Sequence, residues 1–363
     1  LDREIEDVQW AANNRLLIAY DDFDDKVIAS LSLADKVEVI TRDVGGVTLG
    51  RPYASGGFST ANNGTFAYSA GSSTRPADVG VGRGSRATRR ITDLNGDLLD
   101  RKSVGEAEEI RWKSSADGLE VQGWIVKPPG FDPQKKYPLI LEIHGGPFAT
   151  YGPHFSAEVQ LFAAAGYVVL YPNPRGSTSY GDAFANEIHH NYPGQDYDDL
   201  MSGIDAVIGR GYVDETQLFV TGGSGGGVLT AWIVGKTDRF RAAVVAKPVI
   251  NWTSWALTAD MYTFGPQYWF ASLPWEDPDA YWARSPLSLV GNVSTPTALL
   301  TGEQDHRTPI TESEQYYQAL KLRKVDTALI RVPEAPLGIA GRPSHLIAKA
   351  DNILAWFARY RDE

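Results

Sequence analysis

The 363-residue sequence contains no cysteine. This absence excludes disulfide bonds, a thiol nucleophile and a cysteine-ligated metal centre. The sequence also lacks any apolar run near the about 18 residues that a membrane-spanning helix needs, which argues against a transmembrane protein. Because cysteine is absent and we expect the N-terminus of the polypeptide, with any targeting signal, to be missing, the compartment, cytoplasm or periplasm, is left open.

The sequence has no excess of positive charge, since 34 Lys and Arg stand against 45 Asp and Glu, a net charge of −11 at pH 7. Such a balance argues against a nucleic-acid-binding protein and against binding to an anionic membrane surface. The densest basic stretch, residues 83–90, is short and interspersed with Gly and Ser, as in a solvated loop. A hydrophobic content of 43% is that of an ordinary globular protein.

The chain begins Leu1-Asp2-Arg3, without an initiator Met or a signal peptide. Residues 1–105 consist of short β-type runs separated by turn clusters, a pattern typical of a sandwich or of propeller blades. This length supplies roughly two blades, whereas a closed ring needs about 4–8. We therefore expect residues 1–105 to be the C-terminal blades of a truncated β-propeller, whose missing N-terminal part belongs to the same, longer polypeptide.

From residue 106 onward, buried apolar strands alternate with helical patterns. The predicted strands cover 137–143, 167–171, 217–220, 241–246, 297–300 and 327–332, and the predicted helices cover 157–165, 196–208, 312–322 and 344–360. This alternation predicts a mostly parallel sheet that is covered by helices on both faces. We therefore expect residues 106–363 to form a second, α/β domain.

The turn that follows the strand 217–220 carries a Gly-x-Ser-x-Gly pattern, with Ser224 between Gly222 and Gly226. In a nucleophile elbow, a strained strand-to-helix turn exposes the serine hydroxyl, and side chains at the two glycines would collide with backbone. The helix that follows points free N–H groups at the place where an oxyanion would form. The alternatives are a packing turn and a phosphate loop, but the Gly-Lys-Ser/Thr ending of a phosphate loop is absent. Ser224 is thus the predicted nucleophile of an α/β-hydrolase.

Further motifs occur in order along the chain: His-Gly-Gly-Pro at 144–147, Asn-Pro-Arg-Gly-Ser-Thr-Ser-Tyr-Gly at 173–181, Asp-Tyr-Asp-Asp-Leu at 196–200 and Gly-Glu-Gln-Asp-His-Arg-Thr-Pro at 302–309. Together with the elbow they resemble the prolyl oligopeptidase family of serine peptidases, in particular its acylaminoacyl-peptidase and dipeptidyl-peptidase branch. The resemblance covers residues 106–363. It implies an α/β-hydrolase fold behind an N-terminal β-propeller that restricts access to peptides, and it implies no cofactor.

A serine nucleophile needs a base, and the base needs a carboxylate, in the chain order Ser, Asp, His for this fold. Asp305 follows the strand 297–300 at the carboxyl edge of the sheet, and its motif favours the role of the acid over that of a capping residue. The family's histidine should follow the strand 327–332, between a serine and a glycine. This chain instead has Pro336 and Leu337 before the glycine. Leucine cannot accept a proton, so impaired catalysis is expected.

Of the six histidines, His345 alone lies after Asp305 and beyond the last strand, eight positions after Leu337. It is the substitute candidate for the base, and its alternative is a surface residue in a helix's first turn. His189 and His190 are adjacent and lack the i, i+4 spacing of a helical metal pair, so no metal site is predicted.

Loss of the triad histidine costs about 10⁶ in turnover.

The backbone N–H groups of Gly225 and Gly146 are the expected oxyanion donors. Many relatives carry tyrosine after the serine, and Gly225 leaves a barer pocket floor. Arg175 is interpreted either as a structural anchor that binds carbonyl groups or as a contact to the substrate carbonyl.

The segment 247–282 holds five of the ten tryptophans. Aromatic residues at this density suit the walls of an apolar S1 pocket, or else interdomain or dimer packing. The candidates for substrate binding are Trp252, Trp255, Phe264, Tyr268 and Trp269.

These features predict a serine peptidase that cleaves short peptides with an apolar P1 residue. A catalytically inactive homologue that binds peptides or has a structural role is the first alternative, and a carboxylesterase is the second. The sequence leaves exopeptidase or endopeptidase action and a homo-oligomeric state open.

Overall fold

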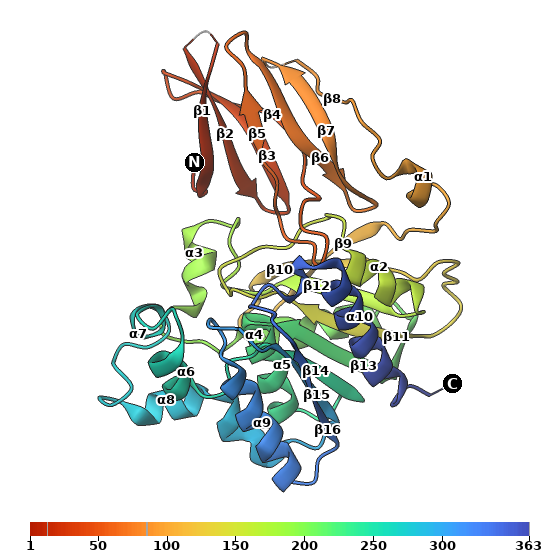
Figure 1. The fold of residues 1–363 in the computed structure, drawn as a ribbon, viewed down its shortest axis with the longest axis vertical. Coiled ribbons are helices and arrows are strands. Elements are labelled where there is room, and N and C mark those ends of the chain that lie inside the picture. The colour runs from red at the N-terminus through yellow and green to blue at the C-terminus, as the bar shows by residue number, and fades with distance from the viewer. Residues whose placement is uncertain (13, 85, 363) are drawn as a thin grey trace.

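The computed structural model describes residues 1–12, 14–84 and 86–362. Asn13, in the first predicted turn cluster, and Ser85, in the basic stretch 83–90, lie outside the described residues. Within this part, the strands form two eight-stranded sheets, one from residues 5–90 and one from residues 107–332 (Figure 1). No helix among the described residues is long and apolar enough to cross a membrane.

The first sheet is antiparallel, with strand order β1-β2-β3-β4-β6-β7-β8 and with β5 paired to β6. Its strands are β1 (Ile5–Ala11), β2 (Arg15–Asp22), β3 (Asp25–Ser32), β4 (Val37–Val44), β5 (Phe58–Thr60), β6 (Thr65–Ser72), β7 (Arg75–Arg83) and β8 (Arg89–Arg90), followed by the short helix α1 (Gly96–Leu99). One residue pair, Val44 with Ala70, links β4 to β6. The sheet thus divides into two groups of four strands. Its origin as propeller blades stays a prediction.

The second sheet has the order β16-β15-β14-β13-β11-β12-β10-β9. Its strands are β9 (Ala107–Lys113), β10 (Glu120–Val126), β11 (Tyr137–Ile143), β12 (Val168–Asn173), β13 (Val213–Gly223), β14 (Ala242–Ala246), β15 (Thr297–Gly302) and β16 (Thr327–Val332). Strands β11 to β16 are parallel and β9 and β10 are antiparallel. The predicted parallel sheet is confirmed.

Helices cover both faces of this sheet (Figure 1). The helices of this part of the chain are α2 (Ala157–Ala164), α3 (Asp182–Ala185), α4 (Asp196–Ile208), α5 (Gly225–Lys236), α6 (Trp252–Thr258), α7 (Phe264–Tyr268), α8 (Pro278–Arg284), α9 (Ile310–Leu322) and α10 (Pro343–Ala358), with 3₁₀ turns η1 (Asn186–Ile188), η2 (Pro286–Asn292) and η3 (Ile339–Gly341). The sequence pattern missed α6 to α8. Their short apolar runs lack helical periodicity, and α6 and α8 begin at side-chain caps, Asn251 and Asp277.

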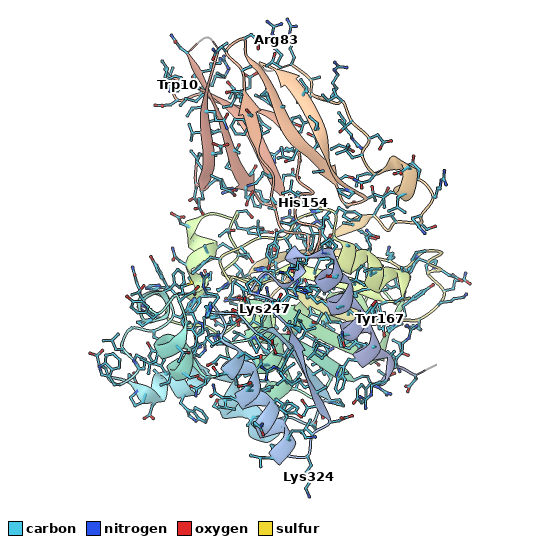
Figure 2. The ribbon with its side chains drawn as sticks, in the orientation of Figure 1. Trp10, Arg83, His154, Tyr167, Lys247 and Lys324 are labelled. Atoms are coloured by element: carbon cyan, nitrogen blue, oxygen red, sulfur yellow. The ribbon has the colours of Figure 1, made fainter. Side chains whose placement is uncertain are left out.

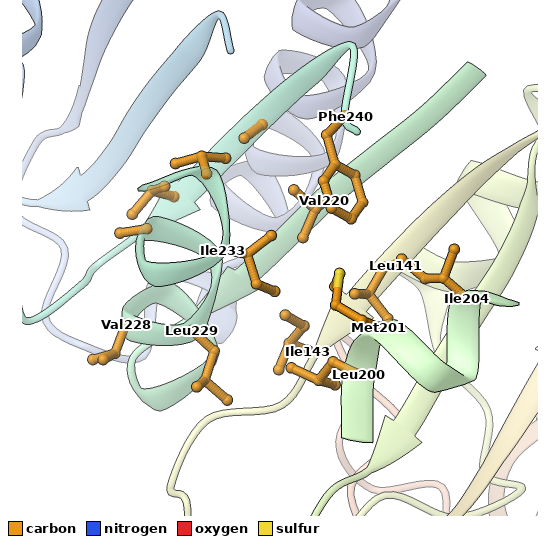
Figure 3. Close-up of a cluster of buried hydrophobic side chains, with 14 of the residues drawn as sticks. Leu141, Ile143, Leu200, Met201, Ile204, Val220, Val228, Leu229, Ile233 and Phe240 are labelled. Carbon is orange, nitrogen blue, oxygen red and sulfur yellow. The ribbon is translucent and has the colours of Figure 1, made fainter. Parts of the chain in front are cut away.

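Side chains alternate between two hydrophobic clusters across the sheet. Leu141 and Val220 pack with α4 and α5 on one face (Figure 3), whereas Ile140 and Phe219 pack with α2 and α10 on the other. Since successive residues of a strand point to opposite faces, a strand buried on both faces must be apolar throughout. The core therefore holds the carboxyl ends of β11, β13 and β14 in fixed register.

The loop between β4 and β5 connects the first sheet to the α/β part. Leu49 and Gly50 accept hydrogen bonds from Ala157 N–H and from the hydroxyl of Ser156, which caps α2. Tyr53 forms an isolated β-bridge with Tyr151. His154 lies at this junction (Figure 2). Residues of the N-terminal part thereby reach the carboxyl edge of the parallel sheet.

Candidate active site

Ser224 occupies the turn between β13 and α5. Its backbone angles, φ 59° and ψ −120°, are those of a strained non-glycine residue. The Ser224 N–H donates to the carbonyl oxygens of Ala246 and Lys247, each at 3.1 Å. Its side chain makes no capping hydrogen bond to α5, so the hydroxyl is not committed to the helix. This geometry is that of the predicted elbow.

The two flanking glycines are required by close backbone contacts. A Cβ atom on Gly222 would lie 2.4 Å from the carbonyl oxygen of Gly226, and one on Gly226 would lie 2.0 Å from that of Ile143. Both distances are far below van der Waals contact. The sequence pattern is therefore explained by the packing of the turn between β11 and α5.

The backbone of Gly225 lies against that of Gly146. A Cβ atom on Gly225 would lie 3.1 Å from the nitrogen of Gly146 and 3.1 Å from the hydroxyl of Tyr192, which donates to the Gly225 carbonyl at 3.0 Å. Tyr53 accepts a hydrogen bond from the adjacent Gly145 N–H at 2.8 Å. The structure thus brings the two expected oxyanion donors together beside Ser224.

A pocket of about 450 Å³ opens at this point. Ser224, Gly225, Gly146 and Leu337 all line it. Its apolar walls comprise Phe148, Tyr192, Val228, Val249, Trp252, Trp255, Met261, Phe264 and Trp269. The elbow therefore lies on the floor of an aromatic-walled cavity, of the kind that holds a small ligand.

Four of the five aromatic residues predicted to bind substrate line this pocket. The fifth, Tyr268, does not line it; its ring contacts that of Phe264, with centroids 4.5 Å apart. Trp252, Trp255 and Trp269 contact one another, with ring centroids 5.0–5.5 Å apart. The aromatic segment is thus a packed wall of the pocket.

Asp305 lies in the loop between β15 and α9 and is buried, with 4% of its surface exposed. Its carboxylate accepts hydrogen bonds from Arg307 N–H at 2.9 Å, from Thr308 N–H at 2.8 Å and from the Thr308 hydroxyl at 2.9 Å. Arg307 and Thr308 line the pocket, whereas Asp305 does not. The carboxylate is fixed in place by these donors, so the capping role and a role as the acid are compatible.

Leu337 stands in the loop after β16, where the resemblance expects a histidine. This loop packs on the Asp305 loop, because Gln304 N–H donates to the Ala335 carbonyl at 3.0 Å and Glu303 N–H to that of Val332 at 3.1 Å. Leu337 lines the same pocket as Ser224. The position expected for the histidine base therefore lies in the site, but it is occupied by leucine, whose side chain cannot accept a proton.

All six histidines lie in the described part of the chain, and none lines the pocket. His345 is half-buried at the start of α10, and His306 is exposed. His144 is buried and hydrogen-bonds to Gly145 O at 2.8 Å and to the Ser177 hydroxyl at 2.9 Å; burial lowers its pKa to about 4. His189 and His190 stack on each other, with ring centroids 3.8 Å apart. Placement of His345 gives no support to its role as substitute base.

Arg175 lies outside the pocket. Its guanidinium is buried and donates to Asp199 at 2.9 Å and to Asp117 at 2.9 and 3.0 Å, and these hydrogen bonds raise the arginine pKa. These contacts favour the structural interpretation of Arg175 over a contact to a substrate carbonyl. Arg175 is an anchor, and its partners are carboxylates rather than the expected carbonyl groups.

Lys247 is a pocket residue that the sequence analysis missed (Figure 2). It follows β14 with a positive φ of 41°, and its ammonium group donates to the carbonyl oxygen of Leu337 at 2.7 Å. Burial lowers its pKa to about 7. Its position directly after a buried strand at the carboxyl edge was the available signal, but a lysine before Pro248 suggests a surface loop.

The described residues hold no group of three or more His, Asp or Glu arranged to bind a metal ion. The described residues that line the pocket include Ser224, the glycines Gly145, Gly146 and Gly225, the cationic residues Lys247 and Arg307, and several aromatic residues. This set is suited to acyl transfer to a hydroxyl.

Comparison with known proteins agrees with the motifs. A sequence profile described as "Prolyl oligopeptidase family" matches residues 153–363. An uncharacterized peptidase, YuxL, of Bacillus subtilis is 40% identical over 275 residues, which are 75% of this chain and 42% of the relative. Dipeptidyl-peptidase 5 of Porphyromonas gingivalis is 31% identical over 68% of this chain and 37% of its own.

Solved structures show the same fold. Acylaminoacyl peptidase of Pyrococcus horikoshii matches 99% of this chain and 56% of its own, with a TM-score of 0.89 and 26% identity. An acylaminoacyl peptidase in complex with Z-Gly-Gly-Phe-chloromethyl ketone matches 100% of this chain and 57% of its own length, with a TM-score of 0.90 and 27% identity. The chain spans less than half the length of the curated relatives and just over half that of these solved structures. It belongs to the prolyl oligopeptidase family of serine peptidases.

Proposed function

We propose that this chain is the hydrolase part of a serine peptidase that cleaves short peptides, as acylaminoacyl and dipeptidyl peptidases do, through an acyl-enzyme on Ser224. The observation that carries the proposal is the pocket in which Ser224 meets Gly225 and Gly146 beneath aromatic walls. Membership of the family supports the reaction class, hydrolysis of a peptide bond. The whole protein's substrates are part of this proposal.

The proposed roles follow from position. The Ser224 hydroxyl attacks the acyl carbon, and the N–H groups of Gly225 and Gly146 stabilise the resulting oxyanion. Asp305 supplies the fixed negative charge that a triad uses to orient its base. With Leu337 at the base position, an enzyme of this design loses on the order of 10⁶ in turnover and keeps roughly 10³–10⁴ over water.

The aromatic walls favour an apolar P1 residue. Trp252, Trp255 and Trp269 offer large apolar surfaces and little hydrogen bonding towards the cavity. A solved acylaminoacyl peptidase is in complex with Z-Gly-Gly-Phe-chloromethyl ketone, a reagent whose last residue is phenylalanine, and this supports the proposal. We therefore propose acylated or short peptides with an aromatic or large aliphatic residue before the scissile bond.

Leu337 favours one second candidate, a non-catalytic homologue that binds peptides. In this alternative the pocket keeps its shape and affinity, and the serine is never activated. It differs from the first proposal in a single measurable property, turnover at Ser224. An esterase, the third possibility, would cleave short acyl esters faster than the matching peptide anilides.

The test is labelling by a fluorophosphonate probe, with the modified residue located by peptide mass mapping. Three chains are compared: the unaltered protein, Leu337→His and Leu337→His with Ser224→Ala as the matched control. We expect Leu337→His to be labelled at Ser224 at least about 10²-fold faster than the unaltered chain, and the control not to be labelled. Absence of labelling at Ser224 in both of the first two chains would refute the serine-hydrolase proposal.

A further inference from the structure

We propose that Lys247 is the general base for Ser224 in this chain, in place of the missing histidine. The inference rests on the proposed function, because it names the group that activates the same nucleophile toward the same acyl substrates. It gives the unaltered chain a slow, amine-dependent hydrolase activity.

The backbone fixes Lys247 to the elbow. Its carbonyl oxygen accepts the Ser224 N–H at 3.1 Å, and both residues line the pocket. A Cβ atom on Gly223 would lie 3.0 Å from Cε of Lys247, so the lysine side chain passes directly over the residue before the nucleophile. The lysine side chain therefore runs from the residue before the nucleophile to the loop after β16.

The end of the lysine side chain reaches the loop that should provide the base. Nζ donates to the Leu337 carbonyl at 2.7 Å, and the same oxygen accepts the N–H of Ile339 at 2.9 Å. An uncharged amine has two N–H bonds and one lone pair. One N–H held by the Leu337 carbonyl orients the amine, as the aspartate of a triad orients its imidazole, and leaves the lone pair for the serine proton.

Four charged groups act on the Lys247 amine from four different elements. Arg51, from the β4–β5 loop, and Lys349, from α10, disfavour its protonation, whereas Asp305 and Glu158, from the β15–α9 loop and from α2, favour it. The two cations are held beside it by ion pairs, Arg51 with Glu142 at 3.0 Å and Lys349 with Glu158 at 2.6 Å.

Burial is the largest influence on Lys247, and together with the two cations it brings the lysine pKa to about 7. A large fraction of the amine is therefore uncharged near neutral pH, which is the condition for a general base. Below that pH the ammonium form has no lone pair. The structure thus places a proton acceptor beside an elbow whose expected acceptor is missing.

The reaction balances without any further reactant. The Lys247 amine takes the proton of the Ser224 hydroxyl as Oγ bonds to the acyl carbon, and the carbonyl electron pair moves to the oxygen that Gly225 and Gly146 bind. The ammonium then returns this proton to the leaving nitrogen as the C–N bond breaks, which gives the acyl-enzyme and a free amine. In the second half of the reaction, water attacks the acyl carbon of the acyl-enzyme and the Lys247 amine takes its proton. The ammonium then returns the proton to Ser224 Oγ as the ester bond breaks, which releases the carboxylic acid.

The test measures the rate of fluorophosphonate labelling at Ser224 from pH 5.5 to 9. The chains are the unaltered protein, Lys247→Met, Lys247→Arg, Leu337→His and the double variant Leu337→His with Lys247→Met. Arginine can keep the hydrogen bond to the Leu337 carbonyl but stays charged, so it separates a base from a structural anchor. The double variant reports whether the pocket still folds without Lys247.

For the unaltered chain we expect labelling that rises with pH, with a midpoint near the lysine pKa of about 7. Both Lys247 variants should be labelled about 10²- to 10³-fold more slowly and without this rise, because general-base catalysis contributes about 10²–10⁴-fold. The double variant should be labelled rapidly, since histidine then serves as the base.

Two results would overturn the inference while leaving the serine-hydrolase proposal intact. One is equal labelling of the unaltered and Lys247→Arg chains at every pH. The other is rapid labelling of Leu337→His with labelling of the unaltered chain no faster than that of Lys247→Met. Absence of labelling in every chain would refute both proposals together.

Discussion

Lys247 Nζ donates a hydrogen bond of 2.7 Å to the carbonyl oxygen of Leu337, so a lysine that lines the pocket is tied to the residue that replaces the expected base. The two residues follow different strands, β14 and β16, and both line the pocket at the elbow after β13. A change at one of them is therefore expected to alter the consequence of a change at the other.

The first prediction concerns this coupling. If Lys247 and a restored histidine are alternative bases, Lys247→Met lowers labelling of Ser224 about 10²-fold or more in the unaltered chain but less than about threefold in the Leu337→His chain. A double-mutant cycle on labelling rates measures the difference. Equal losses in the two backgrounds would show that Lys247 acts on the fold of the elbow rather than on proton transfer.

The second prediction concerns the apolar pocket. Val228, in the first turn of α5, is buried and lines the cavity. In a Leu337→His background, Val228→Phe should lower kcat/KM at least about tenfold for anilides with P1 phenylalanine and much less for P1 alanine, because the added ring occupies pocket volume. Leu257→Phe, on an exposed position of α6, is the matched control. An equal loss for both substrates would place P1 elsewhere.

The third prediction concerns the Arg175 anchor. Asp199→Ala removes the carboxylate that pairs with a buried guanidinium at 2.9 Å, and breaking such a pair costs about 3–5 kcal/mol of unfolding free energy. Arg331→Gln breaks an exposed pair with Glu303 and should cost less than about 1 kcal/mol. Urea unfolding of the two variants gives the comparison. Similar losses for both would contradict the structural role assigned to Arg175.

The fourth prediction concerns pH. Burial lowers the pKa of His154 from 6.5 to about 4. As the pH falls from 6.5 to 4, the unfolded chain takes up a proton here that the folded chain cannot bind, so stability decreases through this window. The loss amounts to about 3 kcal/mol at most. His154→Gln should remove this contribution and leave that of the buried His144, whose pKa is also lowered to about 4, whereas His306→Gln, at an exposed position, should leave both contributions in place.

The variants must be compared because buried carboxyl groups with raised pKa values change the unfolding free energy in the opposite direction as the pH falls. Burial raises the pKa of Asp196 to about 7, and its protonated form is thus favoured in the folded state within the same window. Unfolding free energies of the three chains at pH 4, 5 and 6.5 therefore decide the matter by their differences. Parallel curves for the unaltered chain and His154→Gln would contradict the prediction.

Much of the hydrolase part was predictable because its signals are local. Ser224 stands in a five-residue pattern that only close backbone packing explains, and the apolar strands around it can be buried only in a two-sided sheet. The placement of Leu337 in the pocket followed from motif order. For the aromatic segment, the sequence could not decide between a pocket wall and a packing interface, because a high density of aromatic rings does not show which way the rings point.

Other features were not predictable because they depend on long-range contacts. The role of Arg175 is set by Asp117 and Asp199, which a spacing argument does not bring to it. Lys247 is significant only through its neighbours on α2, α10 and the Leu337 loop. The propeller origin of residues 1–105 stays a prediction, since the described strands form one open sheet.

The most direct test of the central claim is turnover of an N-acyl-phenylalanine anilide by the Leu337→His chain. If the pocket is a serine-peptidase site that lacks its histidine, this single change should release the aniline at least about 10²-fold faster than the unaltered chain does, and Ser224→Ala in the same background should abolish the release. Release that survives Ser224→Ala, or no release by Leu337→His, would contradict the claim.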